Sequence, residues 1–143
     1  MKRFALGAVV LSCWAAPVLA AASVSVEEPW LREAPPTARV LAGYAGFRNP
    51  SDQEDALIEV TTEVADRVEI HTMAMRGGVM RMQPIPFLAL PAKGKASLEP
   101  GGAHLMIYGP KRALRDGQKV PMTFVFRRGA KVRVEVPVRK YPG

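Results

Sequence analysis

The chain has 143 residues, of which 48% are hydrophobic and 23% charged, a composition that is ordinary for one globular domain. Its formal net charge is +7, but its basic residues are not interleaved with aromatic ones as they are in nucleic-acid-binding modules, so we expect no nucleic-acid partner. Its single cysteine, Cys13, lies near the N-terminus, so the rest of the chain has no thiolate to offer a disulfide, a nucleophile or a metal.

The N-terminus has the pattern of a secretory signal peptide. Lys2 and Arg3 precede an apolar run that ends in small residues. We expect residues 1–20 to be removed, with cleavage after Ala22 as the other option, and residues 21–143 to form one domain in the periplasm. The apolar run is too short to span a bilayer comfortably, so no stable membrane insertion is expected.

Two features leave alternatives open. Cys13 could carry a lipid anchor, although Val10-Leu11-Ser12 before it is a poor fit for a lipoprotein site. The basic residues collect late in the chain, and this excess is either a solvated face or a surface for an acidic partner.

After the signal, the sequence consists of short alternating runs separated by Pro and Gly, with no room for a long helix. Many short strands at regular spacing predict an antiparallel β-sandwich or barrel with Greek-key connections. The expected strands lie within residues 23–34, 38–50, 56–63, 66–73, 79–83, 87–91, 96–100, 103–109, 121–129 and 131–140.

Both histidines of the chain fall in expected strands, each with a methionine two residues later. Side chains alternate between the faces of a strand, so His71 and Met73 share one face, as do His104 and Met106. The apolar residues between them fill the opposite faces and should point to the core. We therefore expect both histidines on the side away from the core.

A Gly-Gly pair follows the first histidine and predicts a two-residue hairpin turn. With this turn, all four methionines of the hairpin and His71 project from one face. The register places Arg76 opposite Val79, Met75 opposite Met80, Met73 opposite Met82 and His71 opposite Pro84.

Thioether and imidazole groups together suit Cu(I), whereas a thioether contributes little to Mg²⁺, Ca²⁺ or Zn²⁺ sites. A blue-copper site or a closed zinc site would ordinarily use cysteine. From spacing alone, a metal site and the alternative of a solvated histidine beside core-filling methionines carry equal weight.

The spacing of these residues resembles the signature of the periplasmic copper chaperones with the PCuAC domain. His71 is followed by ten residues and Met82, then by twenty-one residues and His104-x-Met106. The segments "RVEIHTM", "GVMRMQPI" and "PGGAHLMI" are also similar to that family. Tyr108 departs from the family pattern, in which an apolar residue or Met is common at this position.

This resemblance implies a cupredoxin-like β-sandwich that binds one Cu(I) through His71, Met82, His104 and Met106, with Met73 and Met80 as secondary candidates. It also implies delivery of copper to the copper A site of cytochrome c oxidase, through an oxidase subunit or its copper assembly proteins. We expect a monomer.

Catalysis is not expected, because the chain lacks the Gly-x-Ser-x-Gly and His-Glu-x-x-His motifs. The alternative function is a metal-free β-sandwich adaptor that binds an assembly partner through its basic face. The aromatic residues are interpreted as packing groups. They are Trp30, Tyr44, Phe47, Phe124 and Phe126.

Overall fold

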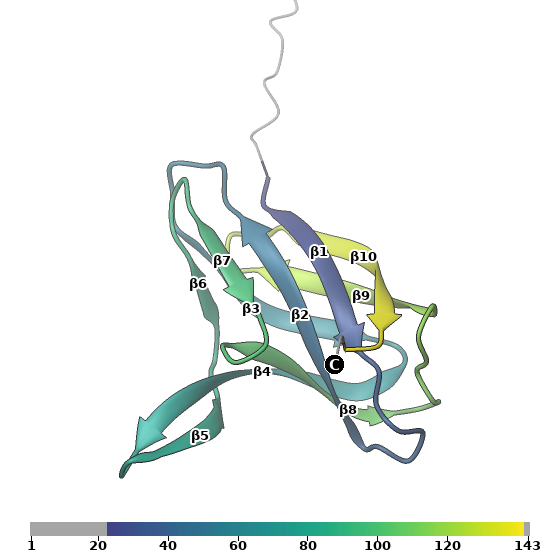
Figure 1. Cartoon of the computed structure of the whole chain (residues 1–143). Helices are drawn as coiled ribbons and strands as arrows, with labels where there is room; N and C mark the ends of the chain where they lie inside the picture. The colour runs from purple at the N-terminus through teal and green to yellow at the C-terminus, as the bar shows by residue number, and fades with distance from the viewer. Residues whose placement is uncertain (1–22, 142–143) are drawn as a thin grey trace, which may run out of the picture.

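The computed structural model describes residues 23–141, which form ten β-strands (Figure 1). The expected signal peptide, both of its possible cleavage sites and Cys13 lie outside the described residues. Among residues 23–141, no helix is long and apolar enough to cross a membrane.

Each expected run overlaps one strand, with some ends shifted by one to three residues, so the all-β prediction is confirmed. The strands are β1 (Ser25–Arg32), β2 (Val40–Arg48), β3 (Asp55–Thr62), β4 (Ala65–Arg76), β5 (Val79–Pro84), β6 (Leu88–Leu90), β7 (Lys95–Leu98), β8 (His104–Pro110), β9 (Lys119–Phe126) and β10 (Lys131–Arg139).

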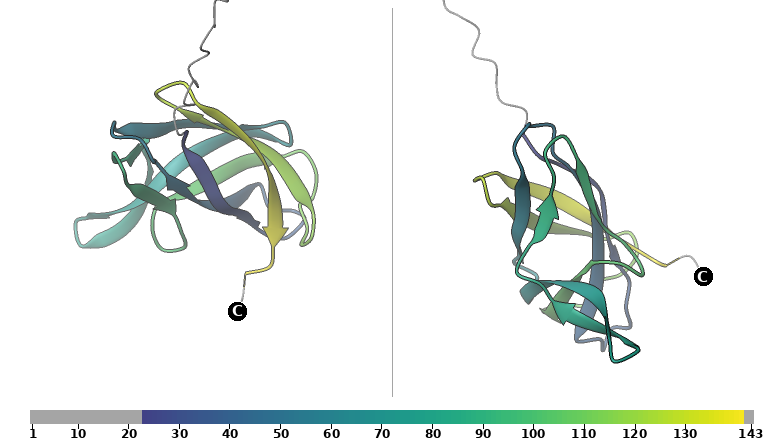
Figure 2. Two further views of the ribbon diagram at one scale, coloured as in Figure 1. Left: turned by 90° about the horizontal axis from the view of Figure 1, so that it is seen from above. Right: turned by 90° about the vertical axis from the view of Figure 1, so that its left-hand side faces the viewer.

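The strands form two layers of a cupredoxin-like sandwich (Figure 2). One layer has the order β5-β4-β8-β2-β1, with β7 also paired to β2, and the other has the order β10-β9-β3-β6. All pairings are antiparallel except one, in which β1 and β10 run side by side in the same direction at Leu31–Val138 and Arg32–Arg139. This parallel contact was not predicted, and it joins the two layers along one edge.

The core lies between the layers and follows from the alternation of side chains along each strand. In β9 every second residue is buried, from Val120 to Phe126. Phe47 of the first layer packs against Phe124 and Phe126 of the second, with ring centroids 5.7 and 5.8 Å apart. The packing role predicted for these three phenylalanines is therefore confirmed.

Candidate metal centre

The hairpin of β4 and β5 has the predicted register and projects from the body of the sandwich (Figure 1). Gly77 and Gly78 both have positive φ, 58° and 76°, as a type I′ turn requires. This register places Met73 opposite Met82, Met75 opposite Met80, and His71 opposite Pro84.

The base of the hairpin lies beside β8, where His71 and His104 are direct cross-strand partners. Their ring centroids are 6.0 Å apart. Both lie on the face opposite the buried Ile70 and Leu105, as predicted, and they are only 8% and 7% exposed, which disfavours the alternative of solvated histidines. Met82 from the hairpin covers His104, with its Sδ 3.1 Å from the ring Nε2.

The loop before β8 fixes the tautomer of the His104 ring. Its Nδ1 lies 2.9 Å from the carbonyl oxygen of Gly102. A carbonyl can only accept, so Nδ1 carries the proton and Nε2 of the neutral ring keeps a free lone pair. This lone pair faces the sulfur of Met82, which also has no proton to give. Two electron-pair donors therefore converge on one place.

The ring of His71 has the opposite tautomer, which is fixed by a neighbour on its own strand. Its Nε2 donates to Glu69 Oε2 at 2.9 Å, which leaves Nδ1 of the neutral ring without a proton. Among the described residues, Nδ1 of His71 is the buried side-chain nitrogen or oxygen atom without a hydrogen-bond partner. An unpaired buried polar atom is costly, and a bound metal ion would remove that cost.

Glu69 is itself anchored by an arginine. Arg67 Nε donates to Glu69 Oε1 at 2.8 Å, and the Arg67 guanidinium lies 4.0 Å from the centroid of the Tyr108 ring. The hydrogen bonds from Arg67 and from His71 lower the pKa of Glu69 and keep it ionised. Tyr108 thus borders the site through Arg67, and its ring centroid is 6.4 Å from that of His71.

The remaining sequence-predicted residues lie two or more strand positions from the histidine pair. Met106 is on the same face of β8 as His104, opposite Glu69, and is partly buried. Met73 is partly buried opposite Met82, whereas Met80 is exposed nearer the turn. The structure therefore brings His71, His104 and Met82 together, with Met106 and Met73 at the border.

Sequence reasoning assigned no role to Glu69 or to the Gly102 carbonyl. The role of Glu69 could have been predicted, because Glu69 is two residues before His71 and therefore lies on the same face of the strand. The role of the Gly102 carbonyl could not, because every residue type has a backbone carbonyl. Both act as the hydrogen-bond acceptors that commonly orient metal-binding histidines.

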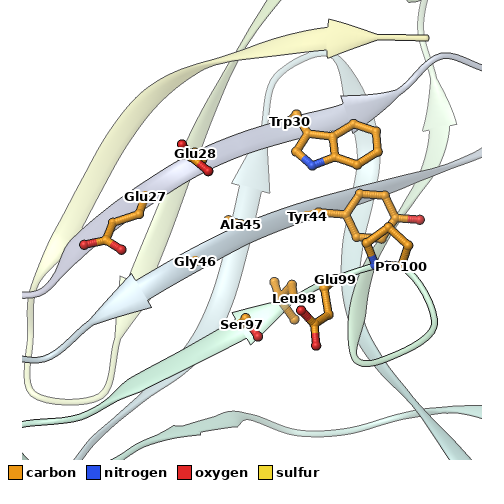
Figure 3. Close-up of a pocket in the computed structure, with 10 residues that line it drawn as sticks. All are labelled: Glu27, Glu28, Trp30, Tyr44, Ala45, Gly46, Ser97, Leu98, Glu99 and Pro100. Carbon is orange, nitrogen blue, oxygen red and sulfur yellow. The ribbon is translucent and has the colours of Figure 1, made fainter. Parts of the chain in front are cut away.

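A hollow of about 600 Å³ lies apart from this cluster on the same layer (Figure 3). Trp30 and Tyr44 line it with ring centroids 4.6 Å apart, and Glu99 and Pro100 close one side. Its lining is aromatic and acidic, whereas the donor atoms that converge lie at the histidine pair. We therefore place the candidate metal centre at the histidine pair and not in the hollow.

Known proteins are similar to this chain over most of its length. The family described as "Putative lipoprotein LpqE-like" matches residues 24–138. "Putative lipoprotein Lxx21020" of Leifsonia xyli subsp. xyli (strain CTCB07) is 28% identical over 121 residues, which cover 84% of this chain and 72% of that protein.

Solved structures with the same fold include a PCuAC domain and the Cu(I) form of a second protein. The apo PCuAC domain from PmoF1 is 29% identical with a TM-score of 0.70, over 82% of this chain and 94% of that one. The solution structure of CuI-DR1885 from Deinococcus radiodurans is 31% identical with a TM-score of 0.65, over 80% of this chain and 76% of that one.

Proposed function

This chain is a member of the LpqE-like family, and on that premise we propose that it binds one Cu(I) through His71, Met82, His104 and Met106. The observation that carries the proposal is the buried histidine pair, in which each ring has one nitrogen held by an acceptor and the other left free. Relatives support it, since DR1885 was solved with Cu(I) and PmoF1 contributes a PCuAC domain.

The donor set fits Cu(I) in charge and in softness. The two thioethers are soft ligands, the two neutral imidazoles also suit copper, and none of the four adds negative charge to balance a divalent ion. Nδ1 of His71 and Nε2 of His104 are the nitrogens free to bind, while Glu69 and Gly102 keep the rings in the right tautomers. Met73 and Met80 are secondary candidates that could replace a thioether when the ion moves.

The site also suits release of the ion. Met82 is 53% exposed on a projecting hairpin, so one ligand can leave without opening the core. A carrier needs such an exchangeable ligand, whereas an enzyme needs a substrate pocket beside its metal. We therefore propose a copper carrier of the periplasm, a monomer without catalytic activity, that delivers Cu(I) to the copper A site of cytochrome c oxidase or to its assembly proteins.

A Cu(I) titration under reducing conditions tests the binding step. In competition with a chelator selective for Cu(I), the protein should take up one tight equivalent, and it should bind zinc more weakly than Cu(I). Tighter zinc binding would overturn the copper assignment. Absence of any Cu(I) binding would favour the alternative of a metal-free adaptor, which would then have to bind an acidic partner through its basic face.

The location of the protein is tested separately. We propose that the mature chain begins at residue 21 or 23, but the names of the family and of its Leifsonia relative favour the lipid anchor at Cys13. Intact mass of the protein recovered from cells decides between them. A chain that starts at Cys13 and carries the added mass of acyl groups would show that the protein is lipid-anchored, and would overturn the start at residue 21 or 23.

A further inference from the structure

The hairpin carries more thioethers than the proposed copper site uses. Its methionine face consists of Met73, Met75, Met80 and Met82, in two directly facing pairs. The other face of the hairpin is mostly polar, and there Arg76 donates to the side-chain oxygen of Gln83 at 3.0 and 3.2 Å. The sequence therefore sorts thioethers to one side of this ribbon and polar groups mostly to the other.

The outer pair of the methionine face does not contribute to the fold. Met75 is 63% exposed and Met80 is 51% exposed, whereas Met122 in the core is 1% exposed. An apolar side chain left in water gains little from folding. Two such side chains lie opposite each other at the end of a projecting hairpin, and we therefore interpret them as binding residues.

Their position relative to the buried site is fixed by the strand geometry. Met75 and Met80 are two residues beyond Met73 and Met82 toward the turn, which corresponds to about 7 Å along the strands. Met82 at the inner end already contacts His104. The methionine face is thus a continuous row of soft ligands from the exposed tip to the buried histidines.

We propose that Met75 and Met80 form a second, weaker Cu(I) site, through which the ion passes between solvent or a partner and the buried site. This inference rests on the proposed function. Facing side chains on paired strands have Cβ atoms about 5 Å apart, so both sulfurs can reach one ion. Two neutral thioethers without imidazole hold Cu(I) less tightly than the buried set, as a site for transit requires.

Methionine methyl NMR tests this on the proposed mature protein, residues 21–143, which contains six of the seven methionines. The first equivalent of Cu(I) should move the methyl signals of Met82 and Met106. The second should move those of Met75 and Met80, while the signal of Met122 stays in place as the internal control. No response of Met75 and Met80 to a second equivalent would overturn the proposal.

A double variant gives the second readout. Met75→Leu with Met80→Leu keeps the apolar surface and removes both sulfurs, so it should lower the affinity for the second equivalent at least about tenfold. The matched control is Val79→Leu, which alters an exposed apolar residue beside the turn without touching a thioether. Unchanged binding of two equivalents by the double variant would refute the tip site.

The two proposals fail in different ways. If the buried site is wrong, the first equivalent is not tight and does not move the methyl signal of Met82. If only the tip site is wrong, the first equivalent binds as expected and no second one follows at Met75 and Met80.

Discussion

Replacing Glu69 should weaken copper binding although Glu69 is not itself a proposed ligand. Its carboxylate accepts a hydrogen bond from Nε2–H of His71 at 2.9 Å, so that Nδ1 carries no proton and is free for the ion. In Glu69→Ala the acceptor is gone, and the proton can move to Nδ1, where it blocks the ligand. Loss of such an orienting partner typically costs about 10–100-fold in metal affinity.

Glu27 provides a matched control for this change. Glu27 is on the same layer as Glu69, and both carboxylates form an ion pair with an arginine. Arg48 Nε lies 2.8 Å from Glu27 Oε1, and Arg67 Nε lies 2.8 Å from Glu69 Oε1. Both carboxylates are partly exposed, and exposed ion pairs contribute little to stability. Glu27→Ala should therefore have the same small effect on melting as Glu69→Ala and no effect on Cu(I) affinity.

The assay is competition for Cu(I) against a chelator of known affinity, with melting curves of both metal-free variants. The expected result is a loss of affinity in Glu69→Ala alone. Equal Cu(I) affinity in the two variants would refute the role assigned to Glu69. A large drop in melting temperature for Glu69→Ala alone would show that Glu69 supports the fold and not the site.

Three further results are expected. Met82→Leu should weaken Cu(I) binding strongly, Met73→Leu weakly, and the double change more than either, because the Met82 sulfur is the one that contacts His104. Each Met→Leu change should alter the free energy of unfolding by less than about 1.5 kcal/mol. If Met73→Leu lowered the Cu(I) affinity more than Met82→Leu in the same competition assay, the ligand assignment would be reversed. Lowering the pH from about 7.5 to about 5 should weaken Cu(I) binding, because imidazole must be neutral to bind a metal and its ordinary pKa is about 6.5; a flat affinity over this range would argue against histidine ligands. The metal-free protein should melt cooperatively in calorimetry, since its core lies between the layers and the proposed ligands lie outside it, whereas an unfolded metal-free form would mean that the metal is structural.

Local sequence determined the strands and the hairpin. The alternation of side chains has a period of two, so it placed His71 with Met73 and His104 with Met106 on the faces that the structure shows. The Gly-Gly pair fixed the turn, and the turn fixed which methionines face each other. These features depend on residues only a few positions apart, which is why they could be predicted.

Pairing between distant strands decided the rest. Between Met82 and His104 the chain passes through β6, which pairs with β3 in the other layer, and returns through β7 on β2. Patterns among nearby residues do not predict that β8 then pairs with β4 and places His104 opposite His71. The burial of both rings follows from that pairing and from the hairpin above it, because exposure depends on what the fold brings over a side chain. The buried histidine pair with its tautomers fixed, which carries the proposed function, therefore exists only in the folded protein.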